Sequence, residues 1–179
     1  VRADAPSAAE VGPRVTGTQA RQPDEGRRIA VDAQALLPDV TGVQRAVYEL
    51  IRHLPAVGAP HEFIVYHPRG APLPELPNGA RVTFRPSRLP TRLRTVRIAW
   101  QQAALPRCLR ADGVELLHAP TYTAPLFTDT PYVLTIYDLI ALHHPEYSKR
   151  LNVLHYRCFL SRSARRARRI IVPSRWTER

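Results

Sequence analysis

The sequence predicts a doubly wound α/β fold with a mostly parallel sheet. Short apolar runs typical of strands alternate with helical stripes along the chain. The fourth and fifth of these runs are apolar on both faces, as in a parallel sheet covered by helices. The chain has 179 residues, 44% of them hydrophobic, which suits one compact domain with a sizeable core.

Six short apolar runs are the expected strands, and turn-forming residues separate them. The third run alternates apolar and polar residues and is expected at or near an edge of the sheet. The runs are residues 29–31, 63–66, 82–84, 116–117, 133–136 and 170–172.

Two apolar stripes with helical spacing precede the fourth run. Thr41 is expected to cap the first helix, and Pro55 with Gly58 to end it. Pro106 is expected to break or restart the second helix, which Gly113 ends. The first stripe is Val43, Ala46, Val47, Leu50, Ile51 and Leu54, and the second is Leu93, Val96, Trp100 and Ala103.

The formal net charge of +11 is concentrated in two blocks. Residues 85–110 contain seven arginines and no acidic residue, and residues 145–179 contain nine arginines and one lysine against two glutamates. Such blocks attract phosphate, whether in nucleic acid, anionic lipid or a nucleotide. A long helix over residues 147–169 is expected to present a basic surface to an anionic membrane or a phosphate-bearing substrate, with a solvated face as the alternative. Its arginines are Arg157, Arg162, Arg165, Arg166, Arg168 and Arg169.

The start of the chain predicts no buried structure. Residues 1–27 lack apolar periodicity and are expected to form a disordered tail. They also lack the apolar core of a secretory signal, and no apolar run reaches the ~20 residues of a membrane span, so a cytoplasmic location is expected. Cys108 and Cys158 lie far apart without a CxxC pattern, and we interpret them as buried small apolar residues.

Ligands of open parallel sheets bind outside the carboxyl ends of the strands, and this rule selects four places. The first place follows the first strand and contains Gly42, Val43, Gln44 and Arg45. Glycine lets a backbone approach a ligand closely, and a helix N-terminus favours anions. An ordinary capped turn is the alternative, and neither a GxGxxG nor a Walker pattern is present.

The second place follows the fourth strand and contains His118 and Tyr122. A histidine at a strand end can donate to a hydroxyl group or take up a proton. The alternative is a histidine that shapes the turn before Pro120.

The third and fourth places follow the last two strands. Asp138 closes an apolar strand just after Tyr137, and an aspartate there is costly to bury without a partner. It could act as a base or stabilise charge, or it could cap a helix or lock the loop. The adjacent histidines His143 and His144 point in different directions, so no metal site is expected. Ser174 is expected to cap whatever follows the sixth strand.

Four segments of the chain resemble, in order, the N-terminal half of the retaining GT-B glycosyltransferases, especially the bacterial mannosyltransferase-like group. They are residues 28–54 (RIAVDAQALLPDVTGVQRAVYELIRHL), 114–125 (VELLHAPTYTAP), 133–147 (VLTIYDLIALHHPEY) and 161–177 (SRSARRARRIIVPSRWT). The resemblance implies that residues 28–179 form a Rossmann-like acceptor-binding domain. It also implies a C-terminal domain that binds a nucleoside-diphosphate sugar and carries a paired-glutamate motif, and this chain does not contain that domain.

The resemblance further implies an activity and its partners. Sugar passes from the nucleoside-diphosphate donor to a hydroxyl group of a glycan or lipid-linked acceptor, in the synthesis of a glycan, polysaccharide or glycolipid. No cofactor and no metal are expected. The chain is then a fragment, a truncated product or half of a split enzyme, and is expected to be inactive alone.

The resemblance also implies roles for particular residues. The glycine loop would face the donor phosphates and the cleft, although the family often has two glycines where this chain has only Gly42. Asp138 keeps the family's aspartate and is the first catalytic candidate, with His118 the second. Many members have a histidine where Tyr137 stands. Tyr122 matches a loop that lines the acceptor cleft, and Ser174 completes the substrate-binding candidates.

A second function class stays open at this stage. The chain could be a non-catalytic basic α/β module that binds an anionic membrane, a partner protein or nucleic acid. Nucleic acid is the weakest of these candidates, because neither RNP-like aromatic residues nor zinc fingers are present.

Overall fold

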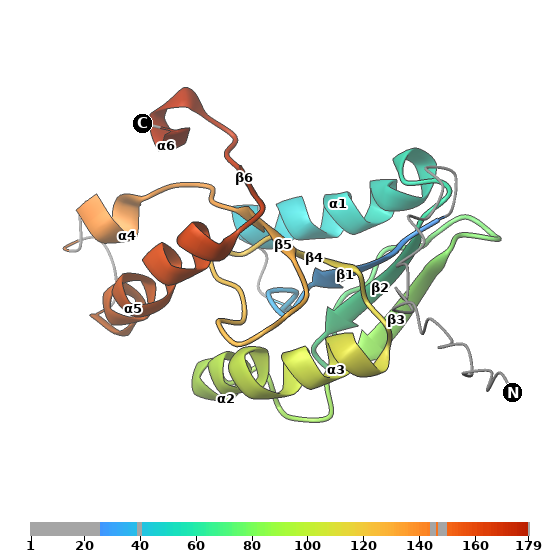
Figure 1. Ribbon diagram of the computed structural model, residues 1–179, viewed down its shortest axis with the longest axis horizontal. Helices are drawn as coiled ribbons and strands as arrows, with labels where there is room; N and C mark the ends of the chain where they lie inside the picture. Colours follow the sequence, from blue (N-terminus) through green and yellow to red (C-terminus); the bar gives the residue numbers. More distant parts are fainter. Residues whose placement is uncertain (1–25, 39–40, 144–145, 147–149, 179) are drawn as a thin grey trace, which may run out of the picture.

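The computed structural model describes residues 26–38, 41–143, 146 and 150–178. Within them, six parallel strands form one sheet in the order β3-β2-β1-β4-β5-β6 (Figure 1). The direction of winding reverses between β1 and β4, so the predicted doubly wound, Rossmann-like fold is confirmed. The strands are β1 Arg28–Asp32, β2 Glu62–His67, β3 Val82–Pro86, β4 Leu116–Ala119, β5 Tyr132–Thr135 and β6 Arg169–Ile171.

The predicted strands all form, and two of them lie at the edges of the sheet. β3 is one edge, as its alternating pattern predicts, and β6 is the other. All three residues of β6 are exposed, unlike those of the central strands. The predicted disordered tail, except for its last two residues, lies outside the described residues.

Helix α1 (Gly42–Val57) covers one face of the sheet. Thr41 caps it as predicted: its Oγ1 accepts from the Gln44 backbone N–H at 3.4 Å, and the Gln44 side chain accepts from the Thr41 N–H at 2.6 Å. The prediction that Pro55 ends the helix is wrong. Pro55 lies in the last turn, where it removes a single hydrogen bond, and the Gly58 N–H closes the helix by donating to Leu54 O.

The crossover from β3 to β4 lies on the opposite side of the sheet from α1 (Figure 1). It consists of α2 (Arg94–Ala99), a π-helical turn η1 (Trp100–Ala104) and α3 (Leu105–Ala111). The predicted restart at Pro106 takes the form of this wide turn. The Leu105 N–H donates to Trp100 O, five residues back, and Pro106 has no N–H to continue the α-helical pattern.

The chain then passes through α4 (Ile140–His143) and α5 (Arg150–Arg166) before β6, and ends in α6 (Arg175–Glu178). The expected start of the long helix at residue 147 lies outside the described residues. Its expected end at residue 169 is wrong, because Arg169 already pairs with Val133 in the sheet. Ser174 caps α6 as predicted, accepting from the Thr177 N–H at 3.3 Å.

The strand residues alternate between two apolar clusters, one on each face of the sheet. Ala30 belongs to the cluster that contains residues of α3 and α5, and Val31 to the cluster that contains residues of α1. Cys108 and Cys158 form no disulfide, as expected, but both are partly exposed, so the prediction that they are buried is wrong. Among the described residues, no helix has the length and apolar character required to cross a bilayer.

Candidate functional site

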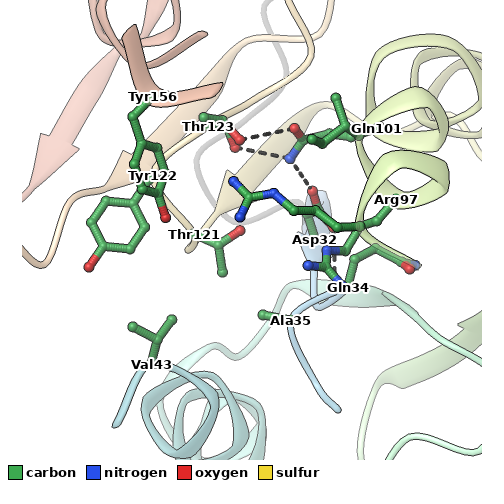
Figure 2. A pocket seen from close by; sticks show the side chains of 12 residues that line it. Asp32, Gln34, Ala35, Val43, Arg97, Gln101, Thr121, Tyr122, Thr123 and Tyr156 are labelled. Carbon is green, nitrogen blue, oxygen red and sulfur yellow. Dashed lines mark hydrogen bonds between the residues drawn. The ribbon is translucent and has the colours of Figure 1, made fainter. Parts of the chain in front are cut away.

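A pocket of about 200 Å³ opens where the winding of the sheet reverses, beside the carboxyl ends of β1 and β4 (Figure 2). This is the position at which ligands bind in doubly wound sheets. Four parts of the chain form its wall: the end of β1, the start of α1, the α2–η1 crossover and the loop after β4, with one residue of α5. The lining residues are Asp32, Gln34, Ala35, Val43, Arg94, Arg97, Ile98, Gln101, Thr121, Tyr122, Thr123 and Tyr156.

Asp32 is the last residue of β1 and lies at the base of the pocket. Its side chain is 1% exposed, and burial raises the pKa of its carboxyl group. Hydrogen bonds from Gln101 and from the Gln34 backbone N–H, and the charge of Arg97, lower that pKa in part. Figure 2 shows the side chains of Gln34, Arg97 and Gln101 gathered around this carboxyl group.

Gln101 joins the first strand to the loop after the fourth. Its Nε2 donates to Asp32 Oδ2 at 2.7 Å and to Thr123 O at 3.1 Å, and its Oε1 accepts from Thr123 Oγ1 at 3.0 Å. The residue lies in the π-helical turn, a geometry that is frequent at functional sites. Through these bonds a buried carboxyl group and a loop residue from a distant part of the chain keep fixed positions.

Gln34 is a buried lining residue whose side-chain amide has no hydrogen-bond partner among the described residues. Its side chain is 3% exposed, yet among the described residues neither its Nε2 nor its Oε1 has a hydrogen-bond partner. A buried, unpaired amide costs about 1–3 kcal/mol, so native proteins contain few of them. Because Gln34 lines the pocket, a small shift of its side chain would present this amide to a ligand that offers both an acceptor and a donor.

Tyr122 has a strained backbone at the wall of the pocket. Its φ is 66°, a left-handed conformation that costs a bulky residue about 1–3 kcal/mol. Its N–H donates to Thr135 O at 3.1 Å, and its hydroxyl donates to Asp138 Oδ2 at 2.6 Å. Burial and this bond raise the pKa of the Tyr122 hydroxyl. The strain thus places two of the predicted site residues, Tyr122 and Asp138, in direct contact.

Asp138 uses both carboxylate oxygens within the protein. Oδ2 accepts from Tyr122, and Oδ1 accepts at 3.0 Å from the N–H of Ile140, the first residue of α4. This is the loop-locking arrangement that the sequence leaves open for this residue. A catalytic role for Asp138 stays a prediction.

Two further tyrosines pack on the ring of Tyr122. The centroid of the Tyr137 ring lies at 5.8 Å and that of the Tyr156 ring at 5.2 Å. The Tyr137 carbonyl also accepts from Thr177 Oγ1 at 3.1 Å, and Ser174 caps that same turn. The loops after β4, β5 and β6 are therefore linked: the ring of Tyr137 contacts that of Tyr122, and Ser174 contacts Thr177, which bonds to Tyr137.

The residues at the start of α1, Gly42 to Arg45, are divided between two surfaces. Val43 lines the pocket, opposite Asp32 (Figure 2). A Cβ atom on Gly42 would meet nothing within 4 Å, so the start of α1 faces open space. Gln44 and Arg45 instead line a separate apolar depression with Leu36 and neighbouring residues, and the Gln44 amide is used in the cap.

The prediction that His118 lies in the loop after β4 is wrong. His118 is the third residue of β4, paired with Val31, and its Nε2 lies 2.9 Å from Thr135 Oγ1. Burial lowers the pKa of this imidazole. β4 extends beyond Leu116 and Leu117, because the ring nitrogen Nε2 of His118 finds a hydrogen-bond partner in Thr135 on the neighbouring strand.

A sequence model of the family described as Glycosyltransferase Family 4 matches residues 40–179. The chain belongs to glycosyltransferase family 4. Its all-parallel Rossmann-like sheet is consistent with the GT-B fold of such enzymes. A search among curated proteins finds no match to the chain.

Several pocket residues of this glycosyltransferase-family domain escaped the sequence reading. Asp32 carries the same signal that singled out Asp138, an aspartate that closes an apolar strand. Arg94, Arg97 and Gln101 lie on helices, and their sequence spacing gives no sign of a site. In the part of the chain that the structure describes, no group of three His, Cys, Asp or Glu residues could hold a metal ion.

Proposed function

We propose that this chain is the acceptor-binding half of a glycosyltransferase that transfers sugar from a nucleoside-diphosphate sugar to an acceptor hydroxyl group. The acceptor occupies the pocket between β1 and β4. The observation that supports this most is the unpaired Gln34 amide at the wall of that pocket. A primary amide can both donate to and accept from hydroxyl groups, as recognition of a sugar or polyol requires.

The donor contributes the second half of the site. Its phosphates approach the N-terminus of α1, where Gly42 leaves open space and the helix dipole favours negative charge. A second domain supplies the rest of the donor site, including the groups that stabilise the leaving diphosphate. The resemblance to the mannosyltransferase-like group favours mannose as the transferred sugar. Asp138 and His118 stay the candidates for a direct part in the chemistry.

A fusion protein tests this proposal. The chain is joined to the donor domain of a family member, and transfer of labelled sugar is followed with a panel of acceptors. The Gly42→Asp substitution places a carboxylate where the donor phosphates would lie, in space that is open in the domain itself. We expect transfer to fall about 100-fold without loss of thermal stability, because an acidic first turn suits a helix N-terminus.

Val57→Asp is the matched control, since Val57 is 80% exposed at the other end of the same helix. We expect it to leave transfer unchanged. If the folded fusion protein transfers sugar to none of the acceptors, or if the two aspartate variants behave alike, the proposal is wrong.

A peripheral membrane contact is a second part of the proposal. The six arginines between the middle of α5 and the first residue of β6 are all exposed, which favours a surface that attracts anionic lipid. Vesicles with and without phosphatidylserine test it by sedimentation. The triple variant R165Q/R166Q/R168Q should lose binding, and R69Q/R88Q/R107Q, three exposed arginines elsewhere, should keep it. Equal binding to neutral vesicles, or to nucleic acid in preference, would contradict this part of the proposal.

A further inference from the structure

The pocket between β1 and β4 contains an excess of positive charge that the proposed function alone does not explain. Arg94 and Arg97 both line it from α2, one turn apart. Among the described residues, neither guanidinium group forms an ion pair with a carboxylate. Arg97 donates to the carbonyl of Thr91 at 3.2 Å, which leaves most of its donors unused.

The surroundings of Arg97 disfavour its positive charge. Arg94 and Arg97 are both only partly exposed, and burial together with the like charge of Arg94 lowers the pKa of Arg97. Among the described lining residues, Asp32 is the one acidic residue, and its oxygens already accept from Gln101 and from the Gln34 N–H. A single carboxylate offsets at most one of the two positive charges.

A ligand that carries its own anionic group would correct this imbalance. Paired guanidinium groups bind phosphate and carboxylate oxygens through short charge-assisted hydrogen bonds. The unpaired Gln34 amide lines the same pocket and can bond to a hydroxyl group of that ligand. The fixed Gln101–Thr123 contact and the Tyr122–Tyr156 ring pair close the remaining walls.

We propose that the acceptor is an anionic sugar or polyol, whose phosphate or carboxylate group binds Arg94 and Arg97 and whose hydroxyl groups bind Gln34. This inference rests on the proposed function, because it specifies what the acceptor pocket receives. It excludes neutral sugars as the preferred acceptors. A phosphate and a carboxylate share the same recognition chemistry, and the experiment below separates them.

Binding to the 179-residue chain is measured by NMR titration with four probes: glucose, glucose 6-phosphate, glucuronate and UDP. We expect glucose 6-phosphate or glucuronate to bind at least about tenfold more tightly than glucose, and the preferred one of the two identifies the anionic group. The affinity should fall as ionic strength rises. Shifted signals should include the backbone of the pocket residues.

Matched variants locate the binding. R94Q/R97Q should reduce the affinity for the anionic probe about tenfold or more and leave that for glucose unchanged. Arg88→Gln is the control, because Arg88 is exposed in the same segment and does not line the pocket. Gln34→Leu removes the unpaired amide, so it should keep or raise the melting temperature while it weakens binding of every sugar probe.

The outcomes separate this inference from the proposed function. Equal binding of glucose and the anionic sugars overturns the inference and leaves the acceptor pocket intact. Preferential binding of UDP at the arginines assigns them to the donor and also overturns it. A folded chain that binds none of the probes overturns it as well, while the transfer assay of the fusion protein decides the proposed function independently.

Discussion

Replacing Gln101 by leucine tests whether the buried Asp32 carboxyl group depends on this amide. The substitution removes one hydrogen bond to a carboxylate, two to Thr123 and a longer one from Gln102 Nε2 at 3.4 Å, while leucine keeps most of the side-chain volume. A bond to a charged group contributes about 1.5–3 kcal/mol and a neutral bond about 0.5–1.5 kcal/mol. We therefore expect Gln101→Leu to lower the free energy of unfolding by about 3–5 kcal/mol near neutral pH.

The neighbouring Gln102→Leu substitution is the matched control. Gln102 lies in the same π-helical turn, and its amide bonds to uncharged groups, the carbonyl of Ala124 and the N–H of Leu126 among them. We expect it to cost about 1–2 kcal/mol, because its partners are neutral and its side chain is only partly buried.

The pH dependence distinguishes the two variants. Burial raises the pKa of Asp32 above its ordinary value of 3.8, and the Gln101 bond lowers it in part. When Asp32 is protonated, every hydrogen bond that Gln101→Leu removes is a neutral one, so the cost is smaller. As the pH rises through the raised pKa, the ionised carboxylate also loses its charge-assisted bond, so the cost of Gln101→Leu grows with pH.

Urea unfolding, followed by the fluorescence of buried Trp100, measures both costs across the pH range in which the chain stays folded. The cost of Gln102→Leu should not change with pH. If the two variants lose equal stability, with no dependence on pH, the Gln101 bond to Asp32 does not stabilise the fold.

Three further predictions concern neighbouring contacts. Tyr122→Phe leaves the Asp138 carboxylate without its 2.6 Å donor and should cost about 1.5–3 kcal/mol in urea unfolding; a cost near zero would show that water replaces the hydroxyl. Ser163→Ala leaves the buried Ala124 N–H unpaired and should lower the free energy of unfolding by about 1–3 kcal/mol, which calorimetry detects as a lower melting temperature. Burial lowers the pKa of His118 below 6.5, so the unfolded chain binds a proton that the folded chain rejects. Stability should therefore fall as the pH drops below 6.5, and less steeply in His118→Gln; parallel melting curves for the two proteins would contradict this.

The positions of the strands and helices could be predicted because the signals for them are local. The stripe from Val43 to Leu54 shows its buried face within three turns, and the Thr41 cap lies directly before it. The errors arose where tertiary contacts outweigh local preference. α1 continues past Pro55, and His118 enters the sheet because Thr135 satisfies its ring.

The candidate site could be predicted only in part. The rule that ligands bind at strand ends located Val43 and Tyr122 at the pocket and Asp138 in contact with Tyr122. Asp32 and Asp138 have the same sequence signature, and nothing in the spacing indicates that Asp32 lies at the base of the pocket while Asp138 locks a loop.

Composition, charge blocks and periodicity established that this chain folds as a basic, doubly wound α/β domain, because burial patterns repeat over a few residues and need no knowledge of the neighbours. The pocket depends on the order of the strands, which places β1 beside β4 although 82 residues lie between Asp32 and Glu115. Only that pairing brings Gln34, Arg97 and Gln101 together. The burial of a charge, and the lack of a partner for an amide, are properties of the surroundings that the folded chain creates.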